Sequence, residues 1–466
     1  MSYNAKLYNS IKNFINEKRI SFHMPVHGGG EIYDEEFRKN IMAFDVTELD
    51  ATDNLAAPKG AILHMHENMA RLFKAKNAHI LVGGSSAGIS AMMLSSLKRN
   101  DTVLIDRCAH ISVINACVLY GFVPVFIERE INKDFGISAP LSVDAIRRAI
   151  NENPSAKAVL ITSPTYYGIC SPIDEIADMA HKNNMVLIVD CAHGSHFTFS
   201  DVLPLLPTQQ GADMCVVSLH KTLGAPTQTA LLLHNSEKIS FEQVKTCINM
   251  VGTTSPSYML MCAADAICEK MSRDGEKLIK KAIEYAKYAK EKIEKTTKCR
   301  CLPKEGGDMS RLVINFSSYE ITGEKVAQML CDKYKIDAEM ADYYNVVCIV
   351  SQANEIEEID ALVLALGEIC SKARVREKAS EIKIEKTPLK IEKNISEAFF
   401  SDTKMVEIRK SIGHICADTV SIYPPGEVCL VPGAKIEEET VDNIIRARKA
   451  GMRITGMQDG CIRVVK

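Results

Sequence analysis

Residues 186–196 read VLIVDCAHGSH, and the next apolar run, MCVVS at 214–218, continues into LHKT at 219–222. Asp190 ends the first run, and Lys221 comes just after the second. Runs this apolar are typical of strands buried on both faces of a parallel sheet. Ligands of open α/β sheets bind beyond the carboxyl ends of such strands, so both side chains are candidate site residues. An acid at this place can also serve only to cap the next helix.

The same pattern extends outward from this stretch, from about Ala78 to Leu233. Short apolar runs alternate with stretches of helical periodicity. The runs are HILVG, DTVLID, VPVFI, AVLIT, MVLIVD, MCVVSL and TALLLH. Strands that alternate with helices predict an α/β domain with a mostly parallel sheet.

The length of 466 residues leaves room for two or three domains. We predict an N-terminal arm and large domain over residues 1–290, with an amphipathic helix at the start. A small α+β domain is predicted over 291–371, a linker rich in Lys and Glu over 372–393, and a C-terminal domain over 394–466. A long charged helix around Leu278–Lys298 leads out of the large domain.

Composition excludes several classes of protein. The formal charge of -3 gives no support for binding to nucleic acid or to a membrane surface. The N-terminus lacks the pattern of a signal peptide, and no apolar stretch reaches the roughly 18 residues of a membrane span. The 16 cysteines are scattered and form no CxxC pair. They predict buried, reduced thiols in a cytoplasmic protein.

Lys221 suggests a particular chemistry. Most lysines are solvated surface groups, but a desolvated lysine can form a Schiff base with an aldehyde. An aspartate nearby can hold a pyridine nitrogen protonated, which makes pyridoxal 5'-phosphate (PLP) an electron sink. Asp190 and Lys221 on consecutive strands meet both needs of a PLP enzyme.

A phosphate group needs an anion cradle, and Gly83–Gly88 lies between a predicted strand and a predicted helix. The small residues and free N–H groups of a helix start fit this task, with Ser85, Ser86 and Ala87 as candidate contacts. Ser218 and His220, beside the lysine, are further candidates. Gly-rich turns before helices are common, and no Walker motif follows.

Three histidines stand near the predicted strand ends. His110 follows the run VLID and could stack on a pyridine ring, although a lone histidine is more often structural. His193 and His196 form an HxxH pair, but no third ligand stands at metal-site spacing, so we predict no metal. His193 is placed over the cofactor or near the departing carboxylate, and His196 is predicted to be structural.

With these residues, the chain resembles the PLP-dependent ornithine/lysine/arginine decarboxylases of the aspartate-aminotransferase fold type, in their short Gram-positive form. The resemblance covers nearly the whole chain. Its elements, in family order, are HMP with His27, ELDATDNLAAPKGAI, DRCAHISVINA, SPTYYG, VDCAHGSHF, SLHKTLGAPTQTA, YPPG and VPG. SLHKT together with DxAHGxH is highly specific. The implied fold is that of PLP-dependent transferases, and residues 394–466 become the decarboxylase C-terminal domain.

The resemblance implies a role for each matching residue. Lys221 would hold PLP, Asp190 would pair with the pyridine nitrogen, and His110 and Ala192 would sandwich the ring. Thr165 would lie near the phenolic oxygen. The phosphate contacts would come from Ser85, Ser86, Ser218 and His220. The family forms at least homodimers with sites at the subunit interface. Its chemistry belongs to polyamine metabolism, with arginine giving agmatine as the first choice of reaction and lysine and ornithine left open.

Departures from the family pattern bear on the substrate. The chain has Val26, Gly28, Cys191 and Ala434 where the family usually has other residues. Acceptors for a long cationic side chain are sought among Asp50, Asp53 and Glu427, although Glu427 can equally be a solvated turn residue. One rival function is another PLP reaction such as transamination, with Arg453 or Arg463 binding a carboxylate. Another is a catalytically silent homologue with a regulatory role.

Overall fold

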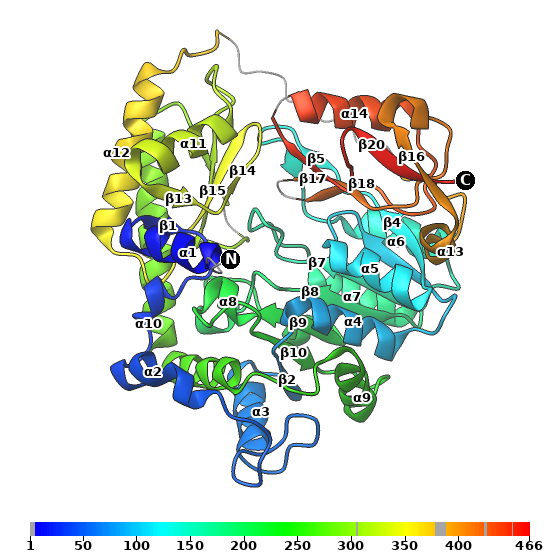
Figure 1. Ribbon diagram of the computed structural model, residues 1–466, viewed down its shortest axis with the longest axis horizontal. Helices are drawn as coiled ribbons and strands as arrows, with labels where there is room; N and C mark the ends of the chain where they lie inside the picture. The colour runs from blue at the N-terminus through cyan, green and yellow to red at the C-terminus, as the bar shows by residue number, and fades with distance from the viewer. Residues whose placement is uncertain (1–4, 304–305, 378–387, 424–425, 450) are drawn as a thin grey trace, which may run out of the picture.

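Seven strands form the central sheet of the large N-terminal part of the computed structural model, which describes residues 5–303, 306–377, 388–423, 426–449 and 451–466 (Figure 1). Their order in the sheet is β2-β10-β9-β8-β7-β3-β4. The strands are β2 (Asn77–Leu81), β3 (Thr102–Asp106), β4 (Val123–Ile127), β7 (Ala158–Thr162), β8 (Val186–Asp190), β9 (Met214–Ser218) and β10 (Ala230–His234). Strands β9, β8, β7, β3 and β4 pair in parallel, and β10 is antiparallel to both of its neighbours. The predicted, mostly parallel sheet is confirmed.

Helices cover both faces of this sheet, because each buried strand presents alternate side chains to opposite faces. In β8, Leu187 and Val189 pack in one core with α3, α6, α7 and the start of α10. Val186 and Ile188 pack on the other face with α4, α5 and α9. The helices are α3 (Ala61–Leu72), α4 (Gly84–Ser96), α5 (Ile111–Tyr120), α6 (Val143–Glu152), α7 (Ile173–Lys182), α8 (Leu219–Thr222), α9 (Phe241–Val251) and α10 (Tyr258–Thr296).

A second sheet packs beside the later part of α10, apart from the large sheet (Figure 1). It has four antiparallel strands in the order β11-β12-β15-β14. Its elements are β11 (Arg300–Leu302), β12 (Arg311–Asn315), α11 (Gly323–Tyr334), β14 (Met340–Ala341), β15 (Asn345–Ile349) and α12 (Ile356–Lys372). The chain reaches this sheet along α10, so the predicted domain limit at 290/291 lies inside one continuous helix.

The N-terminal arm runs back to this second unit. Strand β1 (Ile20–Phe22) pairs in parallel with β13 (Ile336–Ala338), and Phe22 is fully buried in its core. The predicted N-terminal helix is α1 (Lys6–Asn16), which buries none of its residues, and α2 (Glu35–Asn40) follows.

The C-terminal part packs on the same side of the large sheet as α4 and α5. Its elements are α13 (Ile395–Phe400), β16 (Thr403–Glu407), β17 (Val420–Tyr423), β18 (Glu427–Leu430), α14 (Glu438–Lys449), β19 (Arg453–Thr455) and β20 (Cys461–Val465). A short hairpin of β5 (Ile131–Asn132) and β6 (Ile137–Ser138) reaches toward it from the large unit (Figure 1). Much of the predicted linker, residues 378–387, lies outside the described residues. Among those described, no helix has both the length and the apolar character needed to cross a bilayer.

Candidate active site

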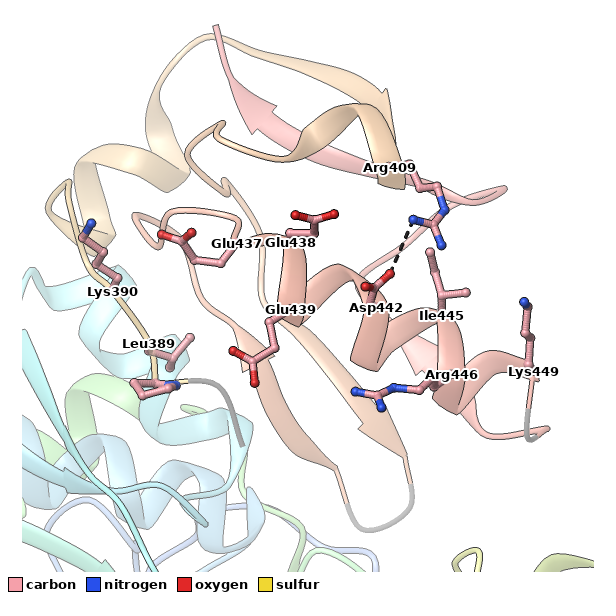
Figure 2. A pocket seen from close by; sticks show the side chains of 11 residues that line it. Leu389, Lys390, Arg409, Glu437, Glu438, Glu439, Asp442, Ile445, Arg446 and Lys449 are labelled. Atoms are coloured by element: carbon pink, nitrogen blue, oxygen red, sulfur yellow. Dashed lines mark ion pairs between the residues drawn. The ribbon is translucent and has the colours of Figure 1, made fainter. Parts of the chain in front are cut away.

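Two cavities compete as candidates for the functional site. One, of about 1040 Å³, opens beside α14 and is lined mainly by charged side chains of both signs (Figure 2). Arg409 and Asp442 form an ion pair across it at 3.4 Å. The other, of about 620 Å³, lies at the carboxyl ends of the large-sheet strands and contains Lys221 and Asp190. The smaller cavity is the candidate active site, because it brings nucleophile, acid and imidazole groups together.

Most of the residues predicted from the sequence line this cavity. They are Ser85, His110, Thr165, Asp190, Ala192, His193 and Lys221. Ser86, Ala87, Ser218 and His220 are not in its lining but stand within three residues of Ser85 or Lys221. Asp190 and Lys221 come together because of the sheet topology. Strands β8 and β9 are parallel neighbours, and Asp190 pairs with Val216 in their register.

Lys221 extends from the one-turn helix α8 that follows β9. Its Nζ lies 3.0 Å from Nε2 of His193 and 5.7 Å from the centre of the Tyr166 ring. Desolvation lowers the pKa of Lys221 below its usual value, although the charges of Asp190 and Glu339 act in the opposite direction. A lysine with a lowered pKa has a larger uncharged fraction near neutral pH, and only the uncharged amine is a nucleophile.

His193 lies between Lys221 and a second cation. Its Nδ1 is 3.3 Å from Nη2 of Arg311, and its ring packs against the Tyr166 ring at 4.4 Å between centres. The side chain is buried. Burial first, and then the charges of Lys221 and Arg311, hold the pKa of His193 well below its usual value. The imidazole is therefore neutral at neutral pH.

The acid and the stacking residues complete the inner wall. Asp190 is buried, and its Oδ1 accepts a hydrogen bond from the backbone N–H of Ala192 at 3.1 Å. His110 is the N-cap of α5, where its Nδ1 accepts from the backbone N–H of Ser112. His110 is exposed and lines the cavity, where a flat ligand could stack on its ring. Thr165 is buried beside it at the wall.

The start of α4 offers an anion site. The N–H of Gly84 donates to the carbonyl oxygen of Gln228 at 2.8 Å, but the N-cap residue, Gly83, makes no side-chain cap to the N–H groups that follow, and a ligand could accept from those. Ser218 stands three residues before Lys221. Its Oγ is buried and has no hydrogen-bond partner within the described part of the chain. A buried hydroxyl without a partner costs free energy unless a ligand satisfies it. These groups fit a phosphate.

His220 fits a phosphate under one condition. Its Nδ1 lies 2.9 Å from the carbonyl oxygen of Thr229, so Nδ1 carries the hydrogen and donates it. Burial lowers the pKa of His220, which leaves Nε2 as an acceptor in the neutral ring. Nε2 could donate to an anion only if the ring were protonated. A bound anion would therefore have to raise the pKa of His220 enough to protonate it.

The sequence did not indicate every residue of the site. Arg311, at the start of β12, and Tyr166 were not singled out, although Tyr166 stands in the SPTYYG motif. His196, predicted to be structural, has its Nε2 2.9 Å from Oδ1 of Asp308. The far wall comes from the second sheet and the C-terminal part, and includes Asp342, Tyr343, Ser421, Tyr423, Asn443, Arg446 and Thr455.

None of the four departures from the family pattern is in the described lining of this cavity, although Cys191 stands between two lining residues, Asp190 and Ala192. Val26, Cys191 and Ala434 are buried in packing positions. Gly28 adopts a positive φ of 57°, and a Cβ there would lie 3.2 Å from Ala353.

The three candidate acceptors for a cationic substrate side chain were Asp50, Asp53 and Glu427. Asp53 accepts hydrogen bonds from four backbone N–H groups around the start of α3, which lower its pKa to about 2 although burial opposes the shift. Neither Asp53 nor Asp50 lines the cavity of its own chain among the described residues. The side chain of Glu427 lies outside the described residues.

The comparisons first define a class of protein. The fold is that of PLP-dependent decarboxylases and aminotransferases. The lysine decarboxylase LdcF of Francisella novicida matches with a TM-score of 0.80 and 18% identity over 94% of this chain and 76% of its own. Ureidoglycine-glyoxylate aminotransferase of Bacillus subtilis matches with a TM-score of 0.57 and 16% identity over 74% of this chain and 92% of its own. The predicted fold class is confirmed.

The family is narrower than the fold. The sequence model described as "Orn/Lys/Arg decarboxylase, major domain" matches residues 5–308. The arginine decarboxylase of Bacillus subtilis (strain 168) is 30% identical over 479 aligned residues, which span 100% of this chain and 98% of that protein. The chain belongs to the Orn/Lys/Arg decarboxylase family. The predicted family is thereby confirmed, and with it an enzyme of the amino-acid decarboxylase kind.

Proposed function

We propose that this chain removes the α-carboxylate from a basic amino acid, with arginine as the preferred substrate and agmatine as its product, using PLP held on Lys221. The observation that carries the proposal is the Lys221 amine beside neutral His193, in a cavity that it shares with Asp190. The choice of arginine is supported by relatives named arginine decarboxylase that align over the whole chain or nearly so.

The residues present fit PLP. Lys221 would hold its aldehyde carbon, and Asp190 would accept a hydrogen bond from the pyridinium N–H and so keep that nitrogen protonated. Ser85, Ser86, Ala87, Ser218 and His220 would surround its phosphate, because the α4 start and the unpartnered Ser218 hydroxyl offer donors. His110, Ala192 and Thr165 would contact the ring and its phenolic oxygen. When bound, PLP supplies an electron sink for the electron pair that stays on Cα as carbon dioxide leaves.

The protein groups have separate tasks in this reaction. Asp190 stabilises positive charge at the sink, which lowers the barrier only if it stays ionised. His193, neutral and held by packing, lies next to the lysine and can pass a proton between Nε2 and Nζ. The buried strand ends exclude water from the region around Cα, so the protein controls which proton reaches it.

The cationic side chain of the substrate needs a carboxylate, and the described wall of one chain offers only Asp190, which is assigned to PLP, and Asp342. Asp342 already accepts from Tyr167 and Asn345, and burial raises its pKa. Arg446, from α14, adds positive charge to the same wall. We therefore propose that a second copy of the chain supplies the acceptor, as expected for a homodimer with shared sites.

Exposed apolar side chains in the N-terminal region support this homodimer. Leu7 of α1 is 78% exposed, Met42 is 71% exposed and Leu49 is 58% exposed. A second copy would bury such groups, which water disfavours. Asp45, Glu48 and Asp50 lie in the same segment and would bring carboxylates to the interface.

A reducing cytoplasm suits the thiols of this chain. All 16 cysteines are free, and most are buried in the cores. An oxidising compartment would act on the partly exposed ones.

The rival transamination has less support. Nε of Arg463 lies 3.0 Å from Asp418, its Nη2 donates to the carbonyl of Ala417, and its guanidinium packs over the Phe399 ring. Arg453 is exposed on β19. Neither arginine lines the cavity among the described residues, so neither stands where a substrate carboxylate would bind.

A substrate panel tests the proposal. PLP-loaded enzyme is mixed with arginine, lysine, ornithine and glutamate, and both carbon dioxide and amine are measured. We expect turnover of arginine above the other two basic amino acids, and an Asp190→Asn variant slower by about a hundredfold or more, a few kcal/mol of lost stabilisation. The matched control is Asp213→Asn. Asp213 is a buried acid just before β9, at the end of that strand away from Lys221, so this variant should keep its turnover. Release of carbon dioxide from none of the basic amino acids would contradict the proposal.

A further inference from the structure

Arg311 is the largest of the fully buried side chains. It opens β12 in the second sheet, yet its guanidinium reaches the loop after β8 in the large unit. Nη2 lies 3.3 Å from Nδ1 of His193 and 3.5 Å from Oδ2 of Asp308. Its Nε and Nη1 have no hydrogen-bond partner within the described part of the chain. A charged group placed here costs free energy of desolvation, so its position calls for a functional reason.

The contact with His193 determines where the imidazole carries its hydrogen. A guanidinium has only donors, so Nδ1 of His193 must accept. A neutral imidazole has one N–H, and it must therefore stand on Nε2. Nε2 lies 3.0 Å from Nζ of Lys221. An N–H that points at an amine can be accepted only by a nitrogen lone pair, which an ammonium group lacks.

We propose that Arg311 is a positioning residue that fixes His193 in its Nε2–H form, so that this N–H donates to an uncharged Lys221 amine. The chain of contacts runs from Asp308 through Arg311 and His193 to Lys221. The proposal rests on the proposed function in one respect only, that Lys221 is the lysine that captures the cofactor.

The network behind Arg311 holds it in place. Asp308 is fully buried, and its Oδ1 lies 2.9 Å from Nε2 of His196 and accepts from Ser310 Oγ at 2.6 Å. Burial alone would raise the pKa of Asp308, but His196, Arg311 and Ser310 hold it below its usual range. Asp308 therefore stays ionised and balances the charge of Arg311.

Several other charged or titratable groups surround Lys221 and His193. The titratable and charged groups that face Lys221 or His193 are Asp190, Glu339, Arg311, His110, His220 and the Tyr166 phenol. Asp190 and Glu339 favour the charged amine, and Arg311 disfavours it. Loss of the Arg311 charge and loss of the Nε2–H form therefore change the protonation of Lys221 in the same direction, and the tests must separate them.

Ring-nitrogen NMR tests the hydrogen position directly. The full-length chain, freed of cofactor and labelled with ¹⁵N-histidine, is measured near neutral pH, where protonated and unprotonated ring nitrogens differ in chemical shift. His193→Gln identifies the signals of His193 among the 12 histidines. We expect an unprotonated Nδ1 and a protonated Nε2 in the unaltered chain. A protonated Nδ1, or a doubly protonated ring, would overturn the proposal even if no Arg311 variant folds.

Three substitutions then separate charge from hydrogen bonding. Arg311→Gln keeps a donor without charge, Arg311→Lys keeps the charge, and Arg311→Met keeps neither. We expect the His193 signals to keep the Nε2–H pattern in Arg311→Gln and to lose it in Arg311→Met. Arg129→Lys is the matched control, because the side chain of Arg129 is also fully buried and paired with an aspartate, Asp106, but lies in the loop after β4.

The protonation of Lys221 is read from the capture of PLP. Only the uncharged amine reacts with the aldehyde, so the pH at which the capture rate is half-maximal reports the amine. We expect this pH to rise by about one unit or more in Arg311→Met, which slows capture near neutral pH roughly tenfold. Arg311→Lys should restore most of the rate, and Arg129→Lys should leave it unchanged.

An unchanged pH profile in folded Arg311→Met would refute the positioning role. This failure is distinct from failure of the proposed function, since neither measurement uses a substrate. A chain that captures PLP with the expected pH profile but decarboxylates no amino acid would leave the Arg311 inference standing and remove the decarboxylase proposal.

Discussion

Lys221 shows at the level of one residue how a reactive group lowers the stability of the fold that holds it. Its amine is desolvated, and its pKa is lowered from the ordinary value of 10.5. Below that pH the unfolded chain takes up a proton more readily than the folded chain does. Folding therefore loses roughly 1.4 kcal/mol for each pH unit between the two pKa values.

We predict that Lys221→Met makes the cofactor-free chain more stable near neutral pH, because Met fills a similar volume without a charge to desolvate. The gain should shrink as the pH rises toward 10.5, where the lysine of the unfolded chain is itself losing its proton. Urea unfolding at both pH values measures this difference. A variant that is less stable than the unaltered chain near neutral pH would show that the amine is not desolvated.

Whether a residue of the site could be predicted from the sequence depended on how far away in the sequence its contact partner stands. Asp190 and Lys221 could be predicted, because each follows its own strand and strand ends of a parallel sheet converge. Arg311 could not, because it comes from another sheet and is 118 residues from His193. The segment DMSR, whose last residue begins the strand RLVINF, offered a charged pair, Asp308 and Arg311, but no sign that this pair faced His193.

At the level of elements, the apolar runs of the sequence correspond to strands β2, β3, β4, β7, β8, β9 and β10. The antiparallel direction of β10 could not be predicted, because a fully buried strand is apolar in either direction. The charged helix expected around Leu278–Lys298 is the second half of the 39-residue α10. Its first half is less charged and buries residues at helical spacing, among them Met261, Ala264 and Ile267, so charge alone did not mark where the helix begins.

Gly88 sets the distance between α4 and the sheet, and with it the anion site at the helix start. A Cβ there would lie 2.7 Å from Leu81 Cδ1 and 2.7 Å from Val216 Cγ2. We predict that Gly88→Ala costs about 1–3 kcal/mol of stability through overpacking and weakens PLP binding by moving the first turn. Unfolding and PLP titration measure the two effects.

Gly367 in α12 provides the matched control for Gly88. A Cβ there meets nothing within 4 Å, so Gly367→Ala should stabilise the helix by roughly 0.5–1 kcal/mol and leave PLP affinity unchanged. If Gly88→Ala bound PLP as tightly as Gly367→Ala does, α4 would not position the phosphate.

At the level of the whole molecule, the cavity is complete only where three parts of the chain meet. The large unit contributes Lys221, the second sheet contributes Tyr343, and the C-terminal part contributes Ser421 and Thr455. The residues proposed to hold the cofactor stand in one part of the chain and could be predicted together. The far wall depends on how the parts pack, which no local pattern encodes.

The proposed homodimer extends this dependence to a second chain. We predict that Met42→Lys dissociates the dimer and lowers activity in step, because it places a charge among apolar side chains that a partner would bury. Leu364→Lys on α12, 69% exposed in the single chain, is the control and should change neither. Sedimentation measures the oligomeric state and amine release measures the activity, both at the same protein concentration. A monomer with full activity would contradict the shared site.

Reductive trapping tests the central claim most directly. The PLP-loaded chain is treated with borohydride, which reduces the bond between lysine and cofactor to a stable amine, and the digested protein is mapped by mass spectrometry. We predict a phosphopyridoxyl group on the peptide that contains Lys221, and loss of the label and of the visible absorbance in Lys221→Ala. A label on a different lysine, or no label on a folded chain saturated with PLP, would contradict the account.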